Sequence, residues 1–315
     1  RDFCLSRGLG DVYKRQVGVC INISNLYHTY EYSKETMRGK SELKQEGAAA
    51  SQTSSGLDRD YITNWSYGIG ETLTLLVPNV KGGGSGSTMS QSEAAMAKAN
   101  PMYNGIYSQL PQYFGEQPWT AGPVYVGAFV MFLFVLGCFI VKGPLKWALL
   151  GATIFSILLS WGKNFMGLTD FFIDYVPMYN KFRAVSSILV IAEFTIPLLA
   201  IFALKEILSK PDMLKQEKNC RGVIAALVLT AGVALILAVA PGTFFSSFIT
   251  TQEMTALKQA LPAEHLAPFV ANLTEMREAI IASDAWRSFF IIVIGCLFLF
   301  LYQLRKLKAS FTLAG

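Results

Sequence analysis

Residues 124–141 read VYVGAFVMFLFVLGCFIV, an apolar stretch without a charged side chain. A helix needs about 20 mostly apolar residues to cross a lipid bilayer, so this stretch predicts a membrane-spanning helix. The segment KGPLK at residues 142–146 follows at once and is long enough only for a hairpin link to a second helix. Residues 124–141 therefore indicate a helical membrane protein.

Four further stretches extend this pattern. Residues 145–161 form a short second candidate, and residues 184–204 carry a single charged side chain, that of Glu193. Residues 222–240 are rich in Ala, Val and Leu, and residues 288–304 in Phe, Ile and Leu. We predict an all-α polytopic membrane protein with about five transmembrane helices, a large external loop and short interfacial helices.

The N-terminal segment does not fit this pattern. Residues 1–16, RDFCLSRGLGDVYKRQ, end in a sequence that resembles translated sequencing-adapter read-through, and we exclude them from the fold prediction as an artefact. A genuine basic cytoplasmic loop is the alternative. The largely apolar residues 17–23 are too few for a span, and we expect them to be the end of a truncated transmembrane helix. The chain is thus expected to be an internal fragment of a longer protein.

The composition favours lipid as the surrounding solvent. Hydrophobic residues make up 52% of the chain and charged residues 16%, against roughly a quarter charged in soluble proteins, and the mean hydropathy is +0.37. Five cysteines and two histidines are too few for a disulfide scaffold or a histidine-rich metal site. Despite a net charge of +5, membrane lipids rather than nucleic acid are the expected partners.

The distribution of Lys and Arg predicts the topology. The links after the first, third and fifth predicted helices hold ten basic residues, and the two opposite links hold six. Because cytoplasmic loops retain positive charge, we place the C-terminus in the cytoplasm. Residues 24–121 then form an external loop region, and residues 122–315 form the transmembrane bundle with a second external segment at 242–287.

The external regions are not uniform. Residues 42–57 and 81–92 are rich in small residues and are expected to be flexible linkers. Residues 61–80 lie between them and are apolar enough to dock on the membrane surface. Two short helices interrupted by a proline are expected within residues 247–284, and an interfacial helix within residues 169–176.

Two positions near the predicted third helix are candidate functional sites. Glu193 is an ionisable residue in the middle of a predicted span, where a charge is costly and often functional; a hydrogen-bonded packing role is the alternative. Lys181 and Arg183 stand just before that span, where a guanidinium suits a phosphate at headgroup level. Ordinary extension of these side chains toward the lipid interface is the competing explanation.

The first external region supplies the other candidates. Glu71 follows two glycines and can serve as a base, a sugar ligand or a helix N-terminal charge. Trp65 and Tyr67 can stack on sugar rings, although an interfacial aromatic belt would use the same residues. The Asp58-Arg59-Asp60 triplet has a spacing seen in metal-dependent sugar transfer, but such triplets are common by chance. A divalent metal is therefore not indicated, and the cofactor stays open.

Three stretches carry a resemblance to a known family. They are YEYSKETMRGKSEL at residues 30–43, WSYGIGETLTLLVPNVKG at 65–82 and LSWGKNFMGLTDFFIDYVPMYNKFR at 159–183. In this order and spacing they resemble the YfhO family of bacterial membrane proteins, which is placed in the type C glycosyltransferase superfamily. The resemblance covers residues 17 to about 308. One departure is that Phe182-Arg183 is followed by AVSS, without the proline and second arginine often found there in the family.

The resemblance implies a glycosyltransferase in the bacterial inner or cytoplasmic membrane. It would move a sugar from a polyprenyl-phosphate donor to an external cell-envelope acceptor. An essential acidic residue is expected upstream of this fragment, so the catalytic residue is not assigned and the fragment is expected to be inactive alone. Arg183 and Lys181 would contact the donor phosphate, and Glu71 would line the sugar cavity. The alternatives are a transporter or flippase-like protein that uses Glu193, and a scaffold without chemistry.

Overall fold

The computed structural model describes residues 2–36, 57–210 and 212–304 of the chain. Regular structure in these residues is helical, and the only strand-like feature among them is an isolated bridge between Thr88 and Pro111. The all-α prediction is therefore confirmed. The chain divides into two compact units, one formed by Arg1–Asn64 with Thr169–Ala184 and the other by Trp65–Leu168 with Val185–Gly315.

Within the first unit, the N-terminal residues form one long helix. A single helix, α1, covers Asp2–Lys34. It runs without a break through the predicted artefact at residues 1–16, the predicted helix end at 17–23 and the first residues of the predicted external loop. The backbone thus gives no boundary at residues 16 or 23, because nothing in residues 2–34 of this helix is a proline that would interrupt its hydrogen bonds.

Ion pairs between acidic and basic side chains connect the other helices of the first unit. Helix α2, Arg59–Thr63, begins at Asp58, whose carboxylate accepts from the backbone N–H of Asp60 at 2.9 Å. The Arg59 guanidinium forms ion pairs with Asp170 and with Asp174, the latter at 2.6 Å. Both acids lie on α7, Met166–Tyr175, four residues apart and therefore on one face of the helix. The Asp58-Arg59-Asp60 triplet serves to start α2 and bind α7.

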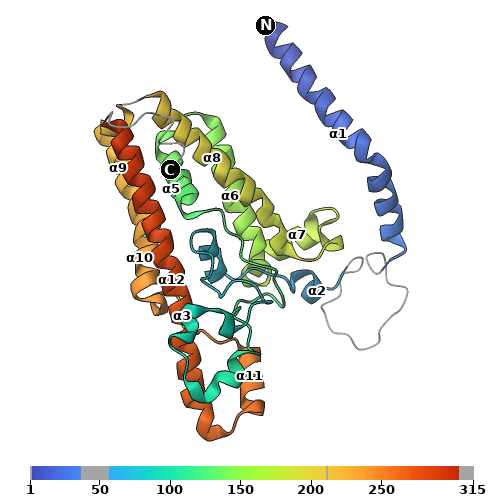
Figure 1. Ribbon diagram of the computed structural model, residues 1–315. Coiled ribbons are helices and arrows are strands. Elements are labelled where there is room, and N and C mark those ends of the chain that lie inside the picture. The colour runs from blue at the N-terminus through green and yellow to red at the C-terminus, as the bar shows by residue number, and fades with distance from the viewer. Residues whose placement is uncertain (1, 37–56, 211, 305–315) are drawn as a thin grey trace. The chain divides into compact units, whose positions relative to one another are not determined.

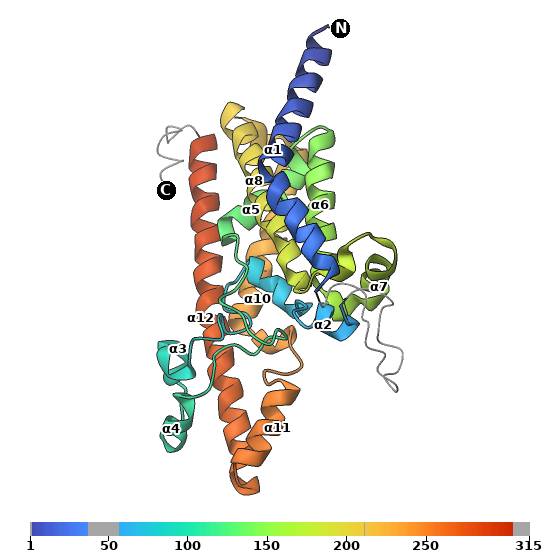
Figure 2. The ribbon, with the colours of Figure 1, turned by 90° about the vertical axis from the view of Figure 1, so that its right-hand side faces the viewer.

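The second unit contains the apolar helices. Helices α5, α6 and α8 pack on one another, and α12 packs on α5 and α10, as both ribbon views show (Figures 1 and 2). A π-helical turn, Val228–Gly232, joins α9 to α10. The helices of this unit are α3 Glu93–Met96, α4 Asn104–Tyr107, α5 Ala128–Ile140, α6 Pro144–Ser160, α8 Val190–Ser209, α9 Glu217–Leu227, α10 Val233–Val239, α11 Thr251–Ala260 and α12 Ala263–Gln303.

Small residues allow these helices to approach closely. A Cβ atom at Gly137 of α5 would lie 3.1 Å from Leu199 Cγ and 3.3 Å from Ala203 Cβ on α8. A Cβ atom at Gly295 of α12 would lie 2.4 Å from the Phe129 ring of α5. Helices in lipid associate through such close packing, because the surrounding hydrocarbon supplies no hydrophobic drive.

The predicted count of about five spans is not confirmed. Among the described residues, three helical segments are long and apolar enough to cross a membrane, namely Val185–Ser209, Glu217–Val239 and Ala263–Gln303, and a fourth is added if the bent pair Pro144–Ser160 and Gly162–Tyr175 counts as one span. The stretch that opened the sequence prediction is shorter than expected. Helix α5 begins only at Ala128, after Gly127 with a φ of 97°, and ends at Ile140.

Helix α12 also changes the predicted boundaries. The predicted span at 288–304 and the second short helix of the external segment 242–287 are parts of one helix of 41 residues, about 60 Å long. Its N-terminal part packs Phe269, Leu273 and Met276 into a separate core with residues from α4 and α11, at the lower end of the view in Figure 2. Because this core buries the first turns of α12, the helix continues past the length that a bilayer needs.

Candidate functional site

The candidate site begins with a tight bend before Glu71. Gly70 is the first residue of a 3₁₀ helix, Gly70–Leu75, and Gly68 precedes it. Glu71 lies in the first turn of this helix. A Cβ atom at Gly70 would lie 2.8 Å from the Phe245 ring, and one at Gly68 would lie 3.1 Å from Glu71 Oε2. The two glycines therefore let the backbone pass close to both groups. As a result the Glu71 side chain points into the second unit and is only 2% exposed.

Neutral donors hold the buried carboxylate of Glu71. The Tyr113 hydroxyl donates to Oε1 at 2.5 Å, and the Gly68 N–H donates to Oε2 at 2.6 Å. Burial raises the pKa of the Glu71 carboxyl above its ordinary value, while these two hydrogen bonds and the charge of Lys81 oppose the increase. A carboxyl group whose pKa is raised keeps its proton to a higher pH than an exposed carboxyl group does.

The two aromatic candidates differ in position. Tyr67 is 3% exposed, and its hydroxyl lies 2.5 Å from Thr74 Oγ1. Trp65 is half-buried, and its indole N–H donates to the Trp119 carbonyl at 3.3 Å. Tyr67 thus lies next to Glu71 inside the unit, whereas Trp65 lies at its surface.

Lys81 is a further charged residue of this site. Its Nζ lies 4.9 Å from the centre of the Phe114 ring and 4.4 Å from that of Phe245. Burial lowers the pKa of the Lys81 amine, while the charges of Glu71 and Glu116 oppose the decrease. Gly82 and Gly83, in the segment predicted to be a flexible linker, are buried, and the N–H of Gly82 donates to the Asn79 carbonyl at 3.0 Å.

The candidate residues of this unit line two adjoining cavities. The smaller, about 10 Å³, is lined by Glu71, Lys81 and Tyr113 among others. The larger, about 220 Å³, is lined by Glu193 and by residues of the loops around it. Both cavities share Tyr67, Gln117 and Thr120 in their walls.

Glu193 lies in the first turn of α8, and its side chain is exposed. The reason is that Val185–Leu189 form a 3₁₀ helix, so the α-helix begins only at Val190. The candidate membrane span Val185–Ser209 includes both helices, so Glu193 lies within that span.

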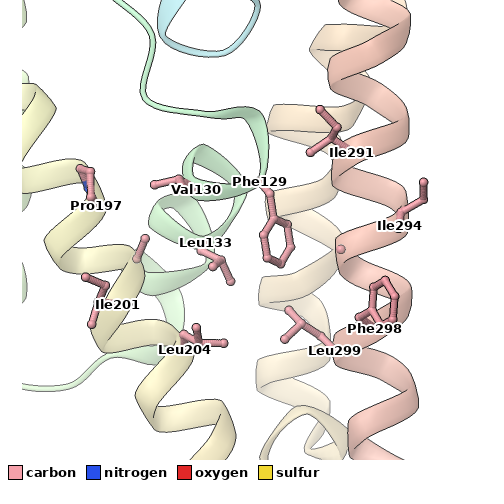
Figure 3. Close-up of a pocket in the computed structure, with 12 residues that line it drawn as sticks. Phe129, Val130, Leu133, Pro197, Ile201, Leu204, Ile291, Ile294, Phe298 and Leu299 are labelled. Atoms are coloured by element: carbon pink, nitrogen blue, oxygen red, sulfur yellow. The ribbon is translucent and has the colours of Figure 1, made fainter. Parts of the chain in front are cut away.

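An apolar cavity of about 510 Å³ begins one turn further along α8. Pro197, Ile201 and Leu204 line it from α8, facing side chains of α5 and α12 (Figure 3). The lining residues, which include no charged or polar side chain, are Phe129, Val130, Leu133, Pro197, Ala200, Ile201, Leu204, Ile291, Ile294, Gly295, Phe298 and Leu299. The second unit thus has a polar and an apolar cavity on successive turns of one helix.

Lys181 and Arg183 belong to the first unit. Arg183 donates to the Tyr61 hydroxyl at 2.7 Å and lies 5.6 Å from the centre of that ring. Lys181 ends a 3₁₀ turn, Tyr179–Lys181. Met178 and Ala184, on either side of these cations, have φ angles of 68° and 64°, which are unusual for residues other than glycine. The structure therefore groups Tyr67, Glu71 and Glu193 in one unit and the two predicted phosphate ligands in the other.

Sequence reasoning missed Lys81 and Arg277. The Arg277 guanidinium is fully buried and binds both oxygens of Glu253 at 2.7 Å. It also lies 4.8 Å from the centre of the Phe114 ring. For Lys81, the only signal in the sequence is a basic residue at the start of the glycine-rich segment 81–92. A flexible linker can begin with a basic residue equally well, so this signal does not identify a site. In the described part of the chain, no group of three His, Cys, Asp or Glu side chains is placed to hold a metal ion.

Comparison with known proteins gave no assignment. No protein-family model, curated protein or solved structure matches the chain.

Proposed function

We propose that this chain is part of a membrane glycosyltransferase that moves a sugar from a polyprenyl-phosphate donor to an external cell-envelope acceptor. In this proposal Glu71, Tyr67 and Trp65 contact the sugar, and Lys181 and Arg183 contact the donor phosphate. The topology predicted from the sequence belongs to the same proposal. In it, the protein lies in the bacterial inner membrane with about five spans, residues 24–121 are outside and the C-terminus is in the cytoplasm.

The observation that carries the proposal is the pair of cavities along α8. Tyr67 and Glu193 line a polar cavity of about 220 Å³, and Pro197 begins an apolar cavity of about 510 Å³ one turn away. An amphiphilic molecule needs this order, with donors and acceptors for its headgroup and apolar side chains for its tail. A lipid-linked sugar is such a molecule, and the buried carboxyl of Glu71 supplies a proton donor or acceptor beside the headgroup.

A binding experiment tests the proposal without requiring an upstream catalytic residue. The full chain in lipid nanodiscs is titrated with polyprenyl phosphate and with the same lipid carrying a sugar. We expect tighter binding of the sugar-bearing lipid and loss of this preference in Glu71→Gln. Glu93→Gln, which changes an exposed glutamate of the same unit, should keep the preference. Equal affinity of the wild-type chain for both lipids would contradict the proposal.

The exposure of Glu193 in the larger cavity favours one second candidate, a transporter that uses this carboxylate. A transporter moves its substrate across a sealed vesicle without consuming a lipid-linked sugar. Uptake into proteoliposomes that is abolished by Glu193→Gln and unaffected by Glu71→Gln would favour this function over sugar transfer.

A further inference from the structure

Lys81 carries three N–H donors that the protein itself does not use. Its Nζ makes no hydrogen bond or ion pair with any residue that the structure describes, although the Phe114 and Phe245 rings lie within 5 Å. Ring faces stabilise the positive charge but do not replace oxygen acceptors. The side chain is half-buried, and its Nζ is not among the fully buried atoms that lack a partner, so an acceptor from outside the chain can reach it.

A second unused donor lines the same small cavity. Gly83 is buried, and its backbone N–H has no hydrogen-bond partner in residues 57–210 or in the other described ranges. Buried backbone N–H groups are rarely left unpaired. Its φ is 80°, and a Cβ atom there would lie 2.6 Å from Asn79 Oδ1, so only glycine brings the backbone into this position. Lys81 and Gly83 therefore offer donors to a common cavity.

We propose that Lys81 and the Gly83 N–H bind a phosphate oxygen at the closed end of the polar cavity. The small cavity, about 10 Å³, has room for about one water-sized atom. The remainder of the ligand lies in the adjoining cavity of about 220 Å³. This inference rests on the proposed function in one respect, namely that a lipid-linked phosphate is one source of the bound phosphate group. Free phosphate offers the same oxygen atoms.

The charges around Lys81 set the conditions for binding. Glu71 and Glu116 face it with negative charge, and Arg277 faces it with a positive charge that Glu253 already pairs. Ionised Glu71 opposes a bound anion, whereas protonated Glu71 does not. Replacing Glu71 with the neutral Gln should therefore tighten phosphate binding at neutral pH, which a purely structural lysine would not produce.

The test measures binding of two probes to the full chain in nanodiscs. Inorganic phosphate and vesicle-borne polyprenyl phosphate are titrated separately against wild type, Lys81→Gln, Lys81→Arg and Lys98→Gln. A charge-assisted hydrogen bond predicts about 10- to 100-fold weaker binding in Lys81→Gln, partial retention in Lys81→Arg, and no change in Lys98→Gln, which alters an exposed lysine of the same unit. Dependence of inorganic phosphate binding on Lys81 identifies a soluble ligand, and dependence of the lipid alone identifies a membrane ligand.

Amine acetylation followed by mass spectrometry keeps the test valid if Lys81→Gln does not fold. In the wild-type chain, the bound probe should reduce labelling of Lys81 and leave Lys98 unchanged. Wild-type affinity of a folded Lys81→Gln for both probes, or loss of affinity only in Lys181→Gln and Arg183→Gln, would overturn the inference. These outcomes are independent of whether the chain prefers a lipid that carries a sugar, so failure of the proposed function is recognised separately.

Discussion

Glu71 and Glu253 are two shielded carboxylates of the same unit with different partners. Arg277 binds both oxygens of Glu253, so a full positive charge compensates the negative one. Among the residues that the structure describes, Glu71 accepts hydrogen bonds only from a tyrosine hydroxyl and a backbone N–H. Glu71 also lines a small cavity. We infer that a carboxylate paired with a full positive charge, such as Glu253, has a structural role. A carboxylate held by neutral donors, such as Glu71, is a candidate functional group.

Breaking the compensated pair should have the largest effect. Arg277→Met leaves Glu253 ionised beside apolar side chains, and the loss of one partner of a buried ion pair costs about 3 to 5 kcal/mol of unfolding free energy. Chemical unfolding in detergent measures this loss. Adding Glu253→Leu to Arg277→Met should restore part of it, because the unpaired charge is then removed. An unchanged midpoint in the single variant would show that the pair contributes nothing.

The uncompensated carboxylate should instead make stability depend on pH. Because the pKa of Glu71 is raised in the folded chain above the ordinary 4.5, the folded state holds a proton that the unfolded state releases. Stability is therefore greatest below pH 4.5 for this group and falls as pH rises toward the folded pKa, by at most about 1.4 kcal/mol per pH unit.

A matched variant isolates this contribution. The difference in unfolding free energy between wild type and Glu71→Gln, followed from pH 4 to pH 8, should grow in favour of the variant. A difference that stays constant with pH would show that Glu71 titrates equally in both states.

Removing one donor should shift the same titration with a smaller effect on stability. Tyr113→Phe deletes the hydroxyl that donates to Glu71 Oε1, at a cost of about 1 kcal/mol. Since that hydrogen bond opposes the increase of the Glu71 pKa, the pKa should rise further. Infrared spectroscopy of the carboxyl stretch during a pH titration measures the shift, with Tyr107→Phe as a control in the other core.

An exposed ion pair should contribute the least to the free energy of unfolding. Arg221 and Glu217 lie one turn apart on α9 with side chains 77% and 82% exposed. Solvent and salt screen such pairs, so Arg221→Gln should change the unfolding free energy by about 0.5 kcal/mol or less. A loss comparable to that in Arg277→Met would mean that burial does not separate the two pairs.

The sequence predicted the helical class and the apolar segments but not their ends. Apolar runs without charges identify helices because lipid leaves backbone groups no other partners. The start of α5 at Ala128 and of α8 at Val190 depends on Gly127 and on the 3₁₀ turn before Glu193. These local conformations are selected by packing. Hydropathy does not report them, so the sequence alone does not locate the first residue of either helix.

The sequence by itself determined that the chain is helical, apolar and rich in candidate residues near Glu71. Composition and periodicity encode these properties, because each depends on neighbours along the chain. Only the tertiary structure decided that Lys81, Tyr113 and Glu71 share a cavity and that Arg277 neutralises Glu253. Both arrangements join residues that do not lie on one secondary-structure element, and burial and charge pairing act through space.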